Sequence, residues 1–160
     1  MESAEKYQPY IIKEYPHWTL FLNQKQMPYV GQCYAWWKDN HPGKGEGMSP
    51  FHLTGRDLVE VFHMIYQDVL IGCKTLGHRT DRLGQGFRLN VAHLANEPIH
   101  NHQMHWHFVP RFAEPVRVQA LLGRTFEDLI AHENYAHIKE LALPHEELLV
   151  IRDTMAEAII

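Results

Sequence analysis

The sequence lacks a long apolar run, an excess of positive charge and more than a trace of cysteine. No segment reaches the roughly 18 consecutive apolar residues that a membrane-spanning helix needs, and the first ten residues contain no apolar stretch of a secretion signal. The formal net charge of −4, with histidine neutral, gives no general attraction for nucleic acid. We therefore expect a cytoplasmic protein with no membrane association and no specific nucleic-acid partner.

The two cysteines, Cys33 and Cys73, form no CxxC pair and lie in apolar surroundings. They are expected to be buried thiols in a reducing compartment, and a disulfide between them is the alternative. With 45% hydrophobic and 21% charged residues over 160 positions, the composition is that of a globular chain. We expect one domain over residues 1–160, with residues 1–8 flexible.

Histidine, by contrast, is abundant: there are thirteen, and several lie in "NHQMHWHFVPRF", residues 101–112. Side chains alternate between the two faces of a strand. Gln103, His105 and His107 would then share one face, and the apolar Met104, Trp106 and Phe108 would share the other. The apolar face is expected to pack on the core and to point the imidazoles outward; a half-exposed strand with incidental histidines is the alternative.

The rest of the chain indicates an antiparallel sheet with few helices. Alternating or β-branched stretches predict strands over 10–15, 17–22, 30–37 and 87–94, in addition to the histidine-rich strand. A capping signal, "TGRD" (54–57), precedes a helix expected to reach about Cys73. Its apolar face is predicted to comprise Leu58, Val61, Phe62, Ile65, Val69 and Leu70. Residues 113–124 look irregular, and a final helix is expected over 143–160, with an apolar face of Leu148, Ile151, Met155 and Ile159. This order predicts an α+β fold: an antiparallel sheet of about five strands with a central helix and a C-terminal helix.

Two kinds of chemistry use adjacent imidazoles. One is metal binding, in which His100 and His102 could join His105 and His107 as ligands. Residues 96–112 hold only one carboxylate, however, and metal-bound histidines often need carboxylates around them. The other is nucleophilic catalysis at phosphorus, in which one neutral imidazole attacks while its neighbours donate hydrogen bonds to phosphate oxygens.

The stretch "QMHWHFVPR" closely resembles the motif of the histidine triad family, His-x-His-x-His followed by apolar residues and often Pro-Arg. Residues 17–38 are similar to the family's first hairpin, and residues 87–97 to the strand that pairs with the triad strand. Residues 113–160, with the final helix, resemble a C-terminal extension found in a branch like the diadenosine polyphosphate hydrolases. The resemblance implies a homodimer without a metal or other cofactor. The implied reaction is hydrolysis or nucleotidyl transfer at the α-phosphate of dinucleoside polyphosphates or nucleoside phosphoramidates.

The resemblance also implies roles for individual residues. His105 matches the nucleophile that forms a covalent nucleotidyl-histidine, and His107 matches the histidine that contacts the phosphate and the leaving group. Asn23 matches a ribose contact, and Asn90 lies where a polar residue often orients the phosphate. His41 matches a fourth histidine, for which Asn40 is the competing match.

One departure from the family pattern concerns the first triad position, which is Gln103. A glutamine amide can donate a hydrogen bond but cannot transfer a proton near pH 7. We therefore expect weakened or altered chemistry, and a nucleotide-binding protein with little turnover is the main alternative. In a rival alignment, His102 takes the missing role.

Two further expectations concern the surroundings of the histidines. Arg111 could approach a phosphate or be an exposed arginine at the strand end. Ile11, Phe21 and Leu22 could line a base pocket, although ordinary core packing is an equally available role for them.

Overall fold

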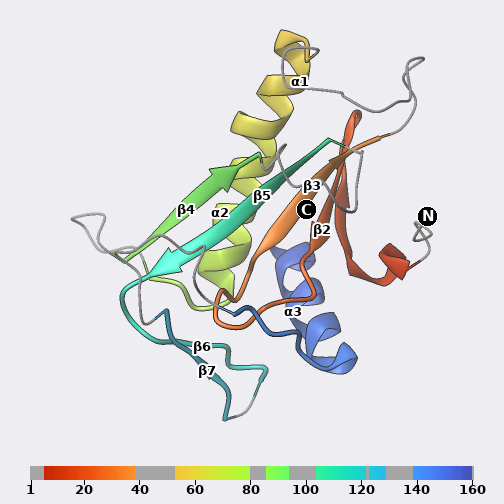
Figure 1. Ribbon diagram of the computed structural model, residues 1–160. Coiled ribbons are helices and arrows are strands. Elements are labelled where there is room, and N and C mark those ends of the chain that lie inside the picture. Colours follow the sequence, from red (N-terminus) through yellow and green to blue (C-terminus); the bar gives the residue numbers. More distant parts are fainter. Residues whose placement is uncertain are drawn as a thin grey trace.

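Five antiparallel strands form the main sheet of the computed structural model (Figure 1). They are β1 (Ile11–Glu14), β2 (Trp18–Leu22), β3 (Cys33–Trp37), β4 (Phe87–Ala92) and β5 (His105–Phe112). Their order in the sheet is β1-β2-β3-β5-β4, so β5 lies between β3 and the outer strand β4. The structure describes residues 6–38, 53–79, 86–93, 104–121, 123–128 and 139–159. The predicted α+β class is confirmed.

The helical elements are short except for two. They are η2 (Gln8–Tyr10), α1 (Gly55–Val59), the π-helical η4 (Glu60–Ile65), α2 (Tyr66–Thr75) and α3 (His145–Ala158). A small hairpin, β6 (Val116–Arg117) with β7 (Thr125–Phe126), occupies part of the chain that was predicted to be irregular. In the described residues, no helix is long and apolar enough to cross a bilayer.

The predicted capping signal does start the central helix. The side chain of Asp57 accepts a hydrogen bond from the Thr54 backbone N–H at 2.6 Å, and the Thr54 hydroxyl accepts one from the Asp57 backbone N–H at 3.4 Å. This reciprocal pair satisfies two N–H groups at the helix start. From there α1, η4 and α2 follow without a break to Thr75.

The apolar face of this helix differs from the prediction. Val61, Ile65, Val69 and Cys73 are fully buried, whereas Leu58 and Phe62 are 36% and 48% exposed. A π-helical turn holds more residues than an α-helical turn. Side chains four residues apart therefore stay in line along the sheet through η4, where an α-helix would have rotated them away.

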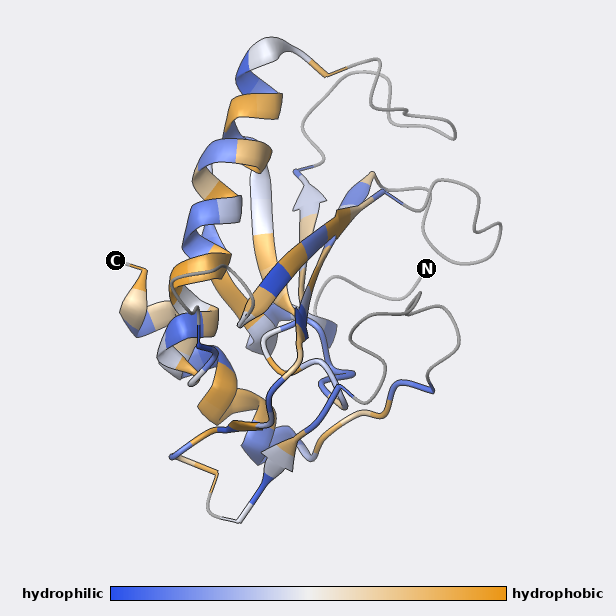
Figure 2. Ribbon diagram, turned by 90° about the vertical axis from the view of Figure 1, so that its left-hand side faces the viewer, coloured by the Kyte–Doolittle hydropathy of each residue, from blue (hydrophilic) through white to orange (hydrophobic). Residues whose placement is uncertain are grey.

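The helices cover one face of the sheet, and the core lies between them (Figure 2). Strand residues whose side chains point to the helices are buried: Trp18, Leu20, Leu22, Cys33, Ala35, Trp37, Phe108 and Phe112. Cys33 and Cys73 are free and buried, which confirms the expectation of buried thiols. The opposite face carries no helix among the described residues, and we call it the helix-free face.

The C-terminal helix α3 packs on α2 and on β1. Its predicted apolar face is confirmed, because Leu148, Ile151, Met155 and Ile159 are all buried. The packing is close: a Cβ at Gly72 would lie 2.7 Å from Cε of Met155. This contact requires glycine at position 72, since a larger side chain would push the two helices apart.

Candidate active site

Strand β5 has the two-sided character that the sequence predicts. Met104 and Phe108 are buried in the core, and the Trp106 ring packs at 5.0 Å from the ring of Phe62 on the helix side. His105 and His107 are half-buried on the helix-free face, with ring centroids 4.9 Å apart. The predicted alternation is therefore confirmed, and it brings the two imidazoles into contact.

Strand β3 supplies the aromatic neighbours of the histidine pair. In the register between β3 and β5, Trp36 lies opposite His105 and Tyr34 lies opposite His107. The Tyr34 ring is 4.6 Å from the His107 ring, and the Trp36 ring is 6.3 Å from the His105 ring. The histidine pair is thus bounded on the β3 side by apolar ring surface.

The surroundings of His107 favour its neutral form. Burial lowers its pKa to about 4, and the nearby charges of His105 and His93 lower it further. At pH 7 this imidazole is therefore uncharged. Its Nε2 is enclosed and has no hydrogen-bond partner among the described residues. An uncharged imidazole with an unpaired ring nitrogen can still donate or accept a hydrogen bond from a ligand.

Asn23 and Asn90 lie on the same face of the sheet as the histidine pair. Asn23 directly follows β2, and its backbone N–H donates to the Gln32 carbonyl at 2.9 Å. The side chain of Asn23 is buried; its Oδ1 accepts from the Lys25 N–H, while its Nδ2 has no partner among the described residues. Asn90 is exposed on β4, two residues before the position opposite His107. The sheet therefore assembles four of the predicted site residues on one surface.

Arg111 does not have the exposed position that was one of its two expected placements. It is buried, and its Nε and Nη2 donate to the two carboxylate oxygens of Asp128 at 2.6 and 3.2 Å. Its guanidinium also lies 5.2 Å from the centre of the Tyr29 ring. The chain after β7 covers this end of β5, so the expectation of an exposed arginine is wrong. Any contact with a phosphate would compete with this ion pair.

Several predicted residues lie outside the described ranges: Gln103, His41, Asn40, His100 and His102. Within the described ranges, no group of three or more His, Cys, Asp or Glu side chains is placed to hold a metal ion.

The structure adds a residue that the sequence did not single out. His93 follows β4, and its ring lies 5.2 Å from the Trp106 ring. Burial, together with the charge of His105, lowers the pKa of His93. Its place in the sequence was a usable signal, because it directly follows the predicted strand that pairs with the histidine strand.

The predicted lining of the base pocket is correct only in part. Phe21 and Ile11 are half-buried and paired with each other, and Phe21 shares the helix-free face with the histidines. Leu22 is 1% exposed and belongs to the core, so its predicted place in the pocket is wrong. Tyr7, which the sequence did not suggest, packs its ring at 4.7 Å from Trp36 and 6.4 Å from Phe21.

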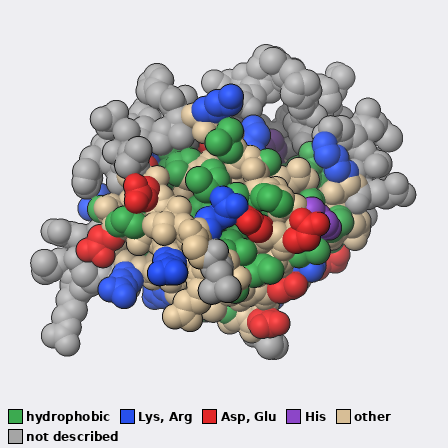
Figure 3. Space-filling model, turned by 90° about the horizontal axis from the view of Figure 1, so that it is seen from below, with side chains coloured by type: hydrophobic (Ala, Val, Ile, Leu, Met, Phe, Trp, Pro, Cys, Tyr) green, Lys and Arg blue, Asp and Glu red, His purple; other side chains and the backbone are tan. Residues whose placement is uncertain are grey.

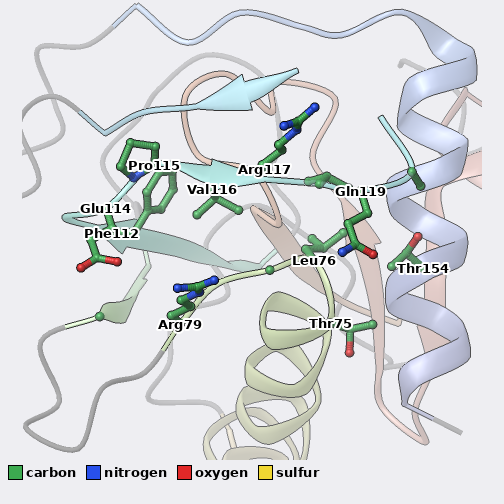
Figure 4. A pocket seen from close by; sticks show the side chains of 14 residues that line it. Thr75, Leu76, Arg79, Phe112, Glu114, Pro115, Val116, Arg117, Gln119 and Thr154 are labelled. Carbon is green, nitrogen blue, oxygen red and sulfur yellow. The ribbon is translucent and has the colours of Figure 1, made fainter. Parts of the chain in front are cut away.

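A separate cavity of about 740 Å³ lies between the end of α2, the chain that follows β5, and α3 (Figure 4). Its lining includes Leu76, Arg79, Phe112, Val116 and Thr154, and neither histidine of the pair. In the view of Figure 4 the Arg117 side chain points away from Arg79. The molecular face in Figure 3 shows positive, negative and apolar side chains interspersed, without a field of one sign.

Comparison with known proteins identifies the fold. No family model matches the sequence, and no curated protein sequence matches it. Solved structures do match. One is a hypothetical histidine triad nucleotide-binding protein from Sulfolobus tokodaii strain 7, with a TM-score of 0.56 and 14% identity over 94% of this chain and 83% of that one.

A second match is a histidine triad protein from Bradyrhizobium japonicum, with a TM-score of 0.53 and 11% identity over 100% of this chain and 98% of that one. At these identities the likeness establishes the fold. The chain has the histidine triad fold, and its two contacting histidines lie on the helix-free face of that fold's sheet.

Proposed function

We propose that this chain is a nucleotide hydrolase or nucleotidyl transferase of the histidine triad family. Its expected substrates are dinucleoside polyphosphates or nucleoside phosphoramidates. The observation that carries the proposal is the contact between His105 and His107, with ring centroids 4.9 Å apart, on the helix-free face. The description of the Sulfolobus protein as nucleotide-binding supports a nucleotide as the ligand. We further propose that the protein acts in the cytoplasm as a homodimer.

In the proposed reaction, a ring nitrogen of His105 attacks the α-phosphorus. A nitrogen–phosphorus bond forms, the bond from phosphorus to the leaving group breaks, and the leaving group takes up a proton. His107 is neutral and has an unpaired Nε2, so in the tautomer with hydrogen on Nε2 it donates to a phosphate oxygen. Water then cleaves the nitrogen–phosphorus bond and releases the nucleotide. An acceptor other than water would make the same step a transfer.

The same surface offers partners for the nucleoside. The rings of Tyr7, Phe21 and Trp36 form an aromatic cluster beside His105. Stacking of a base on an aromatic side chain contributes about 1–3 kcal/mol. The unpaired Nδ2 of Asn23, on the same face, is the proposed donor to a ribose hydroxyl. Asn90, exposed on β4, is the proposed contact that orients the phosphate.

The test uses purified protein with a diadenosine polyphosphate and with an adenosine phosphoramidate. We expect release of AMP from at least one of them, and an adenylylated protein detected by intact mass at neutral pH. The adduct should be absent in His105→Asn. Binding of AMP without turnover of either compound would instead support the alternative that Gln103 motivates, a nucleotide-binding protein.

The second alternative is a metal-binding module that uses His100, His102, His105 and His107. Metal analysis of the purified protein addresses it. Stoichiometric zinc that is lost when these histidines are replaced would contradict the metal-free scheme.

A further inference from the structure

Tyr34 occupies a particular place beside the histidine pair. Its ring centroid lies 4.6 Å from that of His107 and 6.0 Å from that of His105, and its plane is at 88° to both imidazoles. The two imidazoles are themselves 4.9 Å apart. Among the described residues, Tyr34 has the one ring that contacts both. The three rings therefore form a closed triangle.

The backbone that carries Tyr34 is well fixed. Strand β3 is bonded to β2 on one side and to β5 on the other, and Tyr34 is the Cα partner of both Phe21 and His107. Each edge of the triangle is thus anchored in the interior of the sheet. Strand β5 itself offers two imidazoles, since the residue at the first triad position of the sequence is Gln103.

We propose that Tyr34 is a positioning residue for the proposed nucleotidyl transfer. Its ring holds the imidazoles of His105 and His107 in a fixed mutual orientation and keeps water from the His107 ring. The inference rests on the proposed function for its catalytic consequence, but its structural part concerns the free protein. The ring, and not the phenol hydroxyl, performs this role, because the contacts are ring to ring.

The experiment compares Tyr34→Leu, which removes the ring, with Tyr34→Phe, which keeps it. Tyr66→Leu is the matched control, because Tyr66 is also half-buried but lies on α2 and packs against the core. The histidine ring signals of each protein are titrated by NMR. The titratable groups that act on His107 are His105 on its own strand and His93 after β4, and all three variants keep both.

In the wild type we expect His107 to titrate near pH 4. In Tyr34→Leu its pKa should rise toward the ordinary value of about 6.5, since water then reaches the ring. Tyr34→Phe and Tyr66→Leu should leave it near the wild-type value. For turnover, misplacement of a catalytic group by about 1 Å can cost on the order of 100-fold. We therefore expect kcat to fall about 10- to 100-fold in Tyr34→Leu with a smaller change in KM, and Tyr34→Phe to restore most of it.

Two results would overturn the inference: a His107 pKa and kcat in Tyr34→Leu that match the wild type, or equal changes in Tyr66→Leu. Failure of the proposed function looks different. If the wild-type protein turns over neither substrate, the activity measurements speak against that function, and the titration of His107 still decides the role of Tyr34.

Discussion

At the level of single residues, the two imidazoles of β5 differ in what their loss should cost. His105→Ala removes the proposed nucleophile and should abolish turnover, while the fold survives because the side chain lies outside the core. His107→Ala removes a donor and should lower the rate by about 10²–10³-fold. Steady-state kinetics on one phosphoramidate, with circular dichroism as the control for folding, measures both. Wild-type activity in His105→Ala would refute the assignment of the nucleophile.

Gln103 permits a test of the departure from the triad pattern. Gln103→His restores the imidazole of the family motif, and we expect turnover equal to or above that of the wild type. Gln103→Leu removes the hydrogen-bonding group and should be less active. Both rates are measured on the same phosphoramidate. If Gln103→Leu equals the wild type, Gln103 has no part in the reaction and His102 becomes the candidate for the missing role.

His78 makes stability depend on pH at the acid side. The ring is buried and its Nε2–H donates to the Val30 carbonyl at 2.7 Å; burial lowers its pKa to about 4, although this hydrogen bond opposes the shift. In the unfolded chain the pKa is about 6.5, so the unfolded state binds the proton first as pH falls. The free energy of unfolding should therefore decrease from pH 6.5 to about 4 and change little from this group below that.

Urea unfolding at pH 7, 5 and 4 measures this effect. The contribution of one such group is at most about 3 kcal/mol. His107, whose pKa is lowered in the same direction, adds to the slope. His78→Gln should lose part of the pH dependence. An unchanged slope in that variant would contradict the role of His78.

At the level of elements, the ion pair between Arg111 and Asp128 joins the chain after β7 to the end of β5. Asp128→Ala leaves a buried guanidinium without its carboxylate, and breaking a buried pair in this way costs about 3–5 kcal/mol. Chemical denaturation measures the loss. Arg124→Ala is the control, because its pair with Glu147 is partly exposed and should contribute about 0–1 kcal/mol. Equal losses in the two variants would contradict the prediction.

The elements also show which features a sequence can predict. The alternation in β5 and the apolar face of α3 follow from local periodicity, and both are confirmed. The burial of Arg111 depends on Asp128, 17 residues further along, and no local pattern contains that pairing. The π-helical η4 likewise depends on how the helix packs on the sheet, so the exposure of Phe62 could not be read from a spacing that assumes an α-helix.

The site is predictable to the same extent. Family resemblance and alternation together place His105, His107, Asn23 and Asn90, which the sheet brings to one face. Tyr7 and Tyr34 were missed because their contacts with the site cross between strands or come from the N-terminal segment. Such contacts follow from register, which the sequence alone does not specify.

At the level of the whole molecule, the homodimer remains a prediction, and the structure alters its argument. Of the aromatic residues thought to favour it, Trp37 is buried and Trp36 lies on the helix-free face. The apolar side chains that remain exposed gather on α1 and η4: Leu58, Val59, Phe62 and Met64. An exposed apolar group of this kind is typical of an interface.

Sedimentation at micromolar concentration tests the dimer. We expect the wild type to sediment as a dimer and Val59→Glu, at a position 54% exposed, to shift it toward the monomer. A buried carboxylate at an interface is costly, while on a free surface the same change has little effect. A wild-type monomer under these conditions would contradict the prediction.

The alternation of β5 has a consequence for how this protein can change over evolutionary time. Odd-numbered positions from 105 to 107 face the ligand side, and even-numbered positions from 104 to 108 face the core. Selection on chemistry and selection on folding therefore act on neighbouring residues of one strand without acting on the same residue. A position such as 103, in phase with the histidines, can exchange imidazole for amide without disturbing the apolar set, and this separation lets a conserved scaffold explore new substrates.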